Sequence, residues 1–274
     1  MAVSAAVVML AASCGGPADK PTPEPPASSG VTPDESAAPS ITKDELRRGL
    51  RQIIAAGTGH SLAVVAQPPD DASLQWVLPT VSGQWDFIQH ASSTVVTSED
   101  AEVGELTLTT IVTGKTAYVQ ALFDGSLFAP DCWMSPDQQA SWIPAAVAPL
   151  SAAHVLDSEG AHGENVTMPL TAVLGALGFQ KVANATRSDL KGVRVDAVVR
   201  FSGDAVSGWG VSDEAIAAAL DSSTSDSTKQ AVQLFEAAAG ARWEVSIQDL
   251  QEPVDIHPPP TSRILDTEHQ QCRG

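Results

Sequence analysis

The sequence predicts an α+β fold in which one curved antiparallel β-sheet, a half-barrel, carries helices on its concave face. Short segments rich in Val, Thr, Leu, Ile and Trp follow a first helix, separated by Pro, Gly, Asp and Ser. The remaining helical segments are grouped, whereas a parallel sheet would alternate helices and strands one by one. A two-residue turn at Gly114-Lys115 joins two of the strand segments, and such a turn pairs strands antiparallel.

The composition restricts the partners of this protein. Hydrophobic residues make up 43 % of the 274 residues, charged residues make up 18 %, and the net charge is −18. About 230 residues remain beyond a leader and linker, which suits one large domain or two small ones. Because nucleic acid and bare anionic lipid are both polyanions, an acidic chain is expected to be repelled by them.

The N-terminus has the features of a bacterial lipoprotein signal. An apolar run over residues 5–12 closes on Ala11-Ala12-Ser13-Cys14-Gly15, with small side chains directly before the cysteine. The run is too short to span a bilayer and has the length of a signal-peptide core. We expect Cys14 to receive fatty acyl chains such as palmitate and to begin the mature chain. The alternative is a plain secretory signal or a frayed N-terminus, in either case with a chance cysteine.

The stretch that follows is a predicted tether. Residues 14–40 contain seven prolines among Ala, Ser, Glu and Asp. Such a composition cannot bury a core and stays extended, at about 3 Å per residue. A lipidated cysteine followed by a spacer of this kind is a consistent pair of features.

Two cysteines remain after Cys14, at positions 132 and 272. An even remainder outside the cytoplasm favours a disulfide, here Cys132–Cys272, although two free thiols remain an alternative. The bond would tie the C-terminus to the middle of the chain.

The folded part begins with a helix after Thr42. Thr42-Lys43-Asp44-Glu45 is a capping box, in which Thr42 and Glu45 each bond the other's backbone amide. Gly57 and Gly59 are expected to end the helix. Its apolar residues share one face: Leu46, Leu50, Ile53 and Ile54.

A meander of strands is expected next, over residues 61–66, 74–78, 84–89, 94–97, 105–112 and 117–122. In the fifth of these, Leu106 and Leu108 alternate with Thr107 and Thr109, which predicts one buried face. In the turn that follows, Gly114 supplies the positive φ of a type II′ hairpin.

The second half mixes loops, helices and strands. Residues 124–161 are expected to be loops and a short helix, with Trp133 and Trp142 packed inward. A helix is predicted with Thr167 as its cap, Pro169 in its first turn and Gly178 at its end. Strands are predicted over 179–183, 193–201, 242–250 and 254–257. Two further helices are predicted, one opening at Ser212-Asp213-Glu214 and one over 227–239 with Ala231, Leu234, Phe235 and Ala238 inward.

This element order resembles the LppX/LprG-type lipoproteins of mycobacteria and their actinobacterial relatives, which share a half-barrel with the LolA/LolB-type carriers. The resemblance covers most of residues 41–259 and implies a curved sheet around an apolar cavity that holds acyl chains. It rests on element order with few fixed residues. The matching pieces are the Cys14 anchor with its spacer, the 58–65 strand, the Gly114-Lys115-Thr116-Ala117-Tyr118-Val119 hairpin, the Pro169-Leu170-Thr171-Ala172-Val173-Leu174 helix and the closing 242–250 and 253–256 segments.

If such a cavity exists, the apolar faces of the first and second helices are the expected walls. The alternative is that these residues simply pack the core. The candidate lining residues are Leu46, Leu50, Ile53, Leu170, Val173, Leu174 and Leu177.

No sequence motif for catalysis or metal binding is complete. The six histidines show no H-E-x-x-H spacing, and the chain has no G-x-S-x-G. Gly114-Lys115-Thr116 resembles the end of a phosphate-binding loop, but Thr109 stands where the leading glycine belongs. We therefore expect no enzyme, no cofactor and no metal.

The sequence thus predicts a monomeric lipoprotein on the outer face of the cell membrane that binds or carries a lipid or glycolipid. Its alternatives are a packed interaction or sensor module that binds another envelope protein, and a hydrolase whose site is assembled from distant residues. The expected organisation is a signal peptide over 1–13, a tether over 14–40, the half-barrel domain over 41–260 and a tail over 261–274.

Overall fold

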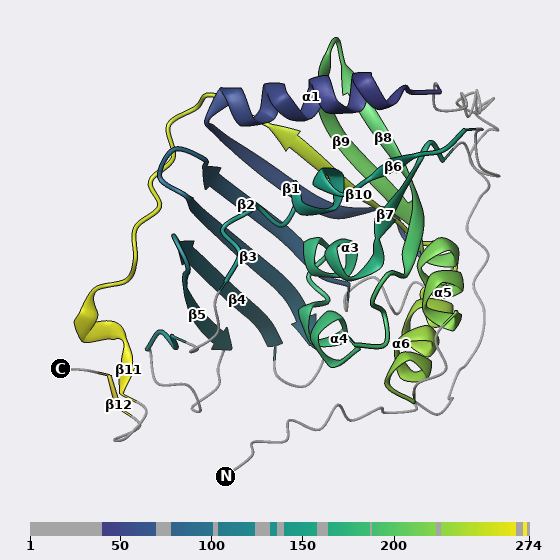
Figure 1. The fold of residues 1–274 in the computed structure, drawn as a ribbon. Coiled ribbons are helices and arrows are strands. Elements are labelled where there is room, and N and C mark those ends of the chain that lie inside the picture. The colour runs from purple at the N-terminus through teal and green to yellow at the C-terminus, as the bar shows by residue number, and fades with distance from the viewer. Residues whose placement is uncertain are drawn as a thin grey trace, which may run out of the picture. The chain divides into compact units, whose positions relative to one another are not determined.

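Ten strands form one antiparallel sheet in the computed structural model (Figure 1). The structure describes residues 40–69, 78–100, 104–123, 132–135, 140–157, 164–186, 188–222, 226–266 and 271–272. The strand order is β5-β4-β3-β2-β1-β10-β9-β8-β7-β6, and the two outermost strands do not pair with each other. The strands are β1 (Thr58–Gln67), β2 (Thr80–Asp86), β3 (Ala91–Asp100), β4 (Gly104–Thr113), β5 (Thr116–Phe123), β6 (His154–Val155), β7 (Val166–Pro169), β8 (Arg194–Ser202), β9 (Ala205–Ser212) and β10 (Arg242–Gln248).

The helices lie on the concave face of this curved, open sheet, so the predicted α+β half-barrel is confirmed (Figure 1). Ala37–Gly274 form one compact unit. Within the described ranges, no helix is long and apolar enough to cross a membrane. The helices are α1 (Lys43–Ala56), α2 (Ala148–Ser151), α3 (Leu170–Ala176), α4 (Gln180–Ala185), α5 (Asp213–Asp221) and α6 (Asp226–Ala237).

Local sequence signals determine α1 and the first hairpins. Thr42 and Glu45 form the predicted capping box, and Gly57 ends the helix with a φ of 81°. The second strand ends at Asp86, before the expected residue 89, because the Asp86 carboxylate accepts the backbone amides of Ile88 and Gln89 in a turn. Gly114 has the positive φ expected of the β4–β5 turn, at 61°. The strand expected over 74–78 lies mostly outside the described residues.

Three predicted elements were wrong, and tertiary pairing explains each. Thr167 does not cap a helix, because the Val166–Pro169 segment pairs with β8 as β7 and α3 begins only at Leu170. Residues 180–183 belong to α4, and Phe179 is the N-cap residue of this helix, with its ring packed on Phe235 and Trp243. Residues 254–257 form no strand, because β1 and β9 already pair with both edges of β10.

Leu234, which was predicted to face inward, is exposed, and so is Ile54, which was predicted on the apolar face of the first helix. Ile54 on α1 is 54 % exposed, and Leu234 on α6 is 36 % exposed. Both lie at the margin of an apolar helix face whose centre is buried, by Leu46 and Ile53 on α1 and by Phe235 on α6. Neither exposed residue is required for the core.

The core is widest where the sheet meets the helices. Trp209 and Trp243 on neighbouring strands are fully buried, with Phe235 of α6 packed edge-on against Trp243. Trp209 donates its indole N–H to the Ala146 carbonyl, at 2.8 Å, which ties the loop before α2 to β9. This loop therefore crosses the concave face as part of the core.

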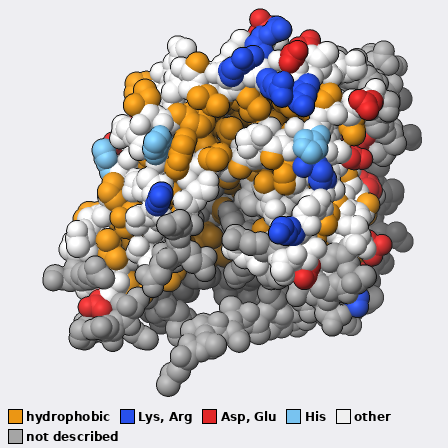
Figure 2. All heavy atoms as spheres, viewed as in Figure 1, with side chains coloured by type: hydrophobic (Ala, Val, Ile, Leu, Met, Phe, Trp, Pro, Cys, Tyr) orange, Lys and Arg blue, Asp and Glu red, His pale blue; other side chains and the backbone are white. Residues whose placement is uncertain are grey.

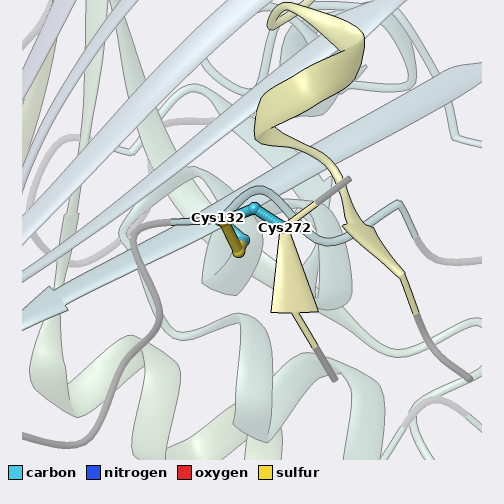
Figure 3. Close-up of a disulfide and its surroundings, with 2 residues drawn as sticks. All are labelled: Cys132 and Cys272. Atoms are coloured by element: carbon cyan, nitrogen blue, oxygen red, sulfur yellow. A yellow bond between two sulfur atoms is a disulfide. The ribbon is translucent and has the colours of Figure 1, made fainter. Parts of the chain in front are cut away.

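The segment of residues 132–135 lies beside the outer strand β5 and connects it to the C-terminal segment. Trp133 and Met134 form bridges to Ile264 and Val119, and a short hairpin follows with β11 (Leu265–Asp266) and β12 (Gln271–Cys272). The predicted Cys132–Cys272 disulfide is present, with Cα atoms 5.5 Å apart (Figure 3). This bond holds the chain end to the segment of residues 132–135, whose Met134 bridges Val119 on the β5 edge. An uncovered edge strand would be open to pairing with another chain.

Asp213, the first residue of α5, makes stability depend on pH. Its side chain is buried, and burial together with the adjacent Glu214 carboxyl raises the pKa of Asp213 from 3.8 to about 7. Between these values the folded state binds more protons than the unfolded state, so this contribution to stability is full below about pH 4 and is lost as pH rises through about 7.

We therefore expect Asp213→Asn to remove part of the fall in stability that the wild type shows between about pH 5 and pH 8. Urea midpoints measured at both pH values provide the check. Asp221→Asn, at the exposed end of the same helix, is the control and should leave the wild-type slope unchanged. An Asp213→Asn profile that parallels the wild type would contradict the assignment.

Candidate functional site on the concave face

The seven residues predicted to line a cavity lie together in the packed interior. Six have exposed fractions of 3 % or less, and Leu50 is half-buried against the same cluster. They come from only two helices and the residue after the second: Leu46, Leu50 and Ile53 from α1, with Leu170, Val173, Leu174 and Leu177 at α3. That they line a ligand cavity stays a prediction.

The space between the sheet and the covering loop is small. A cavity of about 10 Å³ lies among Ala63, Trp85, Ala146 and Ala176. A volume of this size holds about one water molecule, whereas ligand pockets measure roughly 300–1,000 Å³. This part of the interior leaves no room for an acyl chain in the present conformation.

Over β3, β4 and β5, the concave face of the sheet is less buried than it is in the core. Cross-strand pairing places Val96, Leu108 and Ala121 in one row on the side that carries the helices, where Val96 belongs to the core. Thr110 and Val119 form the next pair of that face. Val96 is buried, but the other four residues are only half-buried. We call these five residues the apolar floor, which extends outward from the core and is less covered by other elements than the core is.

The sequence predicted one buried face for β4, and this was wrong. Thr107, Thr109 and Ile111 on the opposite face are half-buried to the same degree as Leu106, Leu108 and Thr110, and only Val112 is fully buried. The alternation in the sequence correctly assigned the residues of β4 to two faces, but it did not predict how far each face is buried. That cover depends on where the loops and helices of the second half cross the sheet, which the pattern of β4 does not contain.

An aromatic cluster lies at the end of this sheet region where β2 joins β3. Trp142 stacks on His90 with ring centroids 4.5 Å apart and meets Phe87 edge-on at 5.7 Å. The Ala140 amide bonds the Lys115 carbonyl in the β4–β5 turn, at 3.2 Å. Trp142 is thus packed as predicted, but only half-buried, at the margin of the concave face.

Hydrophobic side chains gather on the visible face beneath α1 (Figure 2). Two other hollows adjoin the helices. One of about 160 Å³ lies between the start of α1 and the β8–β9 turn, next to Arg48 and Asp204. The other, of about 620 Å³, is a wide, shallow groove between β8 and α5, with Lys191 and Ser222 on its rim. The second hollow has the volume of a ligand site but not the enclosure.

The described part of the chain contains no candidate metal-binding cluster. No group of three or more His, Cys, Asp or Glu side chains there could hold a metal ion. His257 approaches Asp255, with Nε2–Oδ1 at 2.6 Å, but both side chains are exposed at the surface.

Comparisons with known proteins add little beyond the fold. No family model and no curated protein matches the chain. The crystal structure of lipoprotein LppX from Mycobacterium tuberculosis is similar over 78 % of this chain and 97 % of that chain, at 13 % sequence identity and a TM-score of 0.35. This likeness concerns the fold at most and does not place the chain in a family.

Proposed function

We propose that this protein is an extracytoplasmic lipoprotein, anchored in the cell membrane through Cys14, whose half-barrel binds a lipid-like or glycolipid-like ligand. The anchor comes from the sequence around Cys14, and the tether over residues 14–40 would hold the domain outside the membrane. The binding role is carried by the half-covered concave face of β3–β5. We propose the same general activity as in the LppX/LprG-type lipoproteins that the sequence resembles.

The physical argument is the continuity of an apolar floor. Leu108 packs against the core, and Ala121 lies opposite it on the next strand. An acyl chain lying along these strands would bury apolar surface on both partners, at roughly 25 cal/mol per Å² removed from water. Thr110 and Ala121 have small side chains, so a ligand on this floor would meet less steric hindrance there than over large side chains.

In this proposal the helix residues predicted to line the cavity pack the core next to the site and do not contact the ligand. Leu174 and Leu177 would contact a ligand only if α3 moved away from the sheet, because both are fully buried. Gly178, which follows α3, lies close to the side chains of Val96 and Val81, so displacement of α3 would uncover the same floor. Ligand entry from the β3–β5 side is therefore favoured, because it requires no displacement of α3.

Paired substitutions on β4 test the proposal. Thr110→Arg places a long cation on the concave face, whereas Thr109→Arg places the same side chain on the opposite face of the same strand. Both threonines are half-buried, so their effects on folding are matched. We expect Thr110→Arg to weaken binding of a fluorescent fatty acid or phospholipid at least about tenfold, which corresponds to about 1.4 kcal/mol.

The titration uses the chain from residue 14 onward with Cys14→Ser, so that the protein's own acyl chains do not compete. We expect the Thr109→Arg variant to bind the fluorescent lipid with the same affinity as the parent chain. Equal affinities of the two arginine variants would place the ligand elsewhere. No measurable binding by the parent chain would remove the carrier role altogether.

One observation favours a second candidate function, a packed module that binds another envelope protein. The interior at Ala63 and Trp85 leaves only about 10 Å³, as a domain without cargo would. Exposed apolar residues such as Ile88, at 84 %, would then serve as contact points. Absence of lipid binding together with a stable, specific protein complex would select this function.

A further inference from the structure

A row of small residues, three of them with hydroxyl groups, crosses the concave face of the sheet. Cross-strand pairing joins Ser61 on β1 to Gly83 on β2 and Gly83 to Thr94 on β3. Thr94 pairs in turn with Thr110 on β4. The row lies on the face that carries the helices, because Ala63, two residues after Ser61, belongs to the core. We call Ser61, Gly83, Thr94 and Thr110 the hydroxyl row.

The inner end of the hydroxyl row lines the cavity of about 10 Å³ beneath the loop before α2. Ser61, Gly83 and Thr94 form its floor, and Ala146 covers it from the loop. A Cβ built on Gly83 would be 2.7 Å from Oγ of Ser61, so the Ser61 hydroxyl lies over Gly83, within the row. A cavity of this size accommodates about one water-sized group.

Hydrogen-bonding groups around this cavity are not used by the chain itself. Among the described residues, neither the Ser61 hydroxyl nor the Thr94 hydroxyl has a side-chain hydrogen bond. Trp85 also lines the cavity, is 1 % exposed, and has an indole N–H that bonds no other group of the described ranges. Because buried polar groups in proteins are nearly always bonded, a buried indole N–H beside two unused hydroxyls indicates an acceptor from outside the chain.

The surroundings of the cavity do not suit a charged acceptor. Every residue that lines the cavity is uncharged. The rows of paired residues on either side of the hydroxyl row, from Gly59 to Ala117 and from Ala63 to Ala121, also contain only uncharged residues. A carboxylate or phosphate here would lose its hydration without gaining a counter-charge. An uncharged oxygen, as in an alcohol or an ester carbonyl, has no such penalty.

The outer end of the hydroxyl row belongs to the apolar floor. Thr110 is a residue of that floor and pairs directly with Thr94, and side chains paired in this way have Cβ atoms about 5 Å apart. Leu108 and Ala121 lie in the next row of the same face. A ligand on the floor therefore has its inner end within one strand spacing of the cavity.

We propose that Ser61 and Thr94 orient the ligand by bonding one uncharged oxygen of its polar end in the cavity, while its acyl chain lies over Leu108 and Ala121. The inference rests on the proposed lipid binding by the concave face and adds the direction of the ligand and the class of its inner group, an alcohol or an ester. The polar end points inward because the unused hydrogen-bonding groups lie at the inner end of the row, whereas the floor offers mainly apolar contacts.

Two matched probes test this orientation by fluorescence titration: a long-chain alcohol with pyrene at its far end, and the same pyrene-labelled alkane without the hydroxyl. The protein is the chain from residue 14 onward carrying Cys14→Ser. We expect Ser61→Ala/Thr94→Val to bind the alcohol about tenfold more weakly than the parent, as for the loss of two hydrogen bonds. Affinity for the alkane should stay the same or rise, because valine keeps the branched shape of threonine.

The matched control is Ser82→Ala/Thr97→Val, which removes one serine and one threonine hydroxyl from the opposite face of β2 and β3. This variant should bind both probes as the parent does, and circular dichroism confirms that each variant is folded. Equal losses of alcohol and alkane affinity in Ser61→Ala/Thr94→Val, or no loss of either, would overturn the proposed orientation alone. If neither probe binds the parent, the carrier role fails with it.

A crystal structure with a long-chain alcohol that carries bromine at its far end tests the direction independently. We expect the alcohol oxygen beside the hydroxyls of Ser61 and Thr94, and the anomalous signal of bromine on the far side of the apolar floor. Bromine in the cavity with the alcohol oxygen in solvent would overturn the proposal. A water molecule that stays in the cavity of the complex would also overturn it, since the unused groups would then serve a structural water.

Discussion

Trp209→Ala is expected to lower the free energy of unfolding by about 3–5 kcal/mol. The Trp209 side chain is fully buried on β9, and its removal leaves a cavity among the residues of the central core. The change also removes the indole N–H that the Ala146 carbonyl accepts, at 2.8 Å, and so releases the loop that crosses the concave face. Chemical denaturation and a fall in Tm of about 10 °C provide the measurement.

Two further variants separate the loss of packing from the loss of the hydrogen bond in the effect of Trp209→Ala. Trp209→Phe keeps most of the packing and loses only the hydrogen bond, so we expect a loss of about 1–2 kcal/mol. Trp142→Ala removes a half-buried indole at the margin, where stacking on His90 contributes about 1 kcal/mol. A Trp209→Ala variant as stable as Trp142→Ala would contradict the assignment of β9 and the Ala146 loop to one core.

Loss of the disulfide is expected to have the second large effect. Cys132 and Cys272 are separated by 140 residues, and the chain-entropy model gives an upper value of about 5 kcal/mol for closing a loop of this length. Cys132→Ser/Cys272→Ser should therefore unfold at lower denaturant concentration with its secondary structure retained. The double substitution avoids the free thiol that a single one would create.

Thiol reduction is the control for this effect. A reductant should destabilise the wild type to the level of the double variant and leave the double variant unchanged. We also expect the reduced wild type to associate more readily at high protein concentration, because the segment of residues 132–135, which bridges β5 at Val119, would no longer be tied to the chain end. Two titratable thiols in the non-reduced, denatured wild type would show that the bond is not formed.

The sequence predicted best those features whose causes are local. The capping box at Thr42 and Glu45 and the Gly114 turn follow from hydrogen bonds and a φ angle within a few residues. The disulfide followed from counting cysteines outside the cytoplasm. The antiparallel sheet followed because repeated short strands with tight turns have few other ways to pair.

The features that were missed depend on residues far away in the chain. Thr167 and Pro169 carry helix signals, but β8 provides a strand edge that overrides them. Phe179 has the hydrophobicity of a strand, yet contacts with Phe235 and Trp243 favour its place at the start of α4. A single segment cannot report which partner will cover it.

The candidate site was only partly predictable for the same reason. Helical spacing correctly grouped Leu170, Val173 and Leu174 on one apolar face, and the structure buries all three. Spacing could not show whether a gap would remain in front of them. The half-covered floor at Leu108 and Ala121 depends instead on cross-strand pairing and on the path of the loops above it.

The measurement that tests the central claim most directly is native mass spectrometry of the lipidated protein, extracted from its own membrane in mild detergent. We expect a population heavier than the acylated chain by the mass of one lipid-like molecule, present in the wild type and in Thr109→Arg and depleted in Thr110→Arg. Wild-type protein that carries only its covalent acyl groups, with no added mass under conditions that retain lipid on a known carrier, would contradict the account.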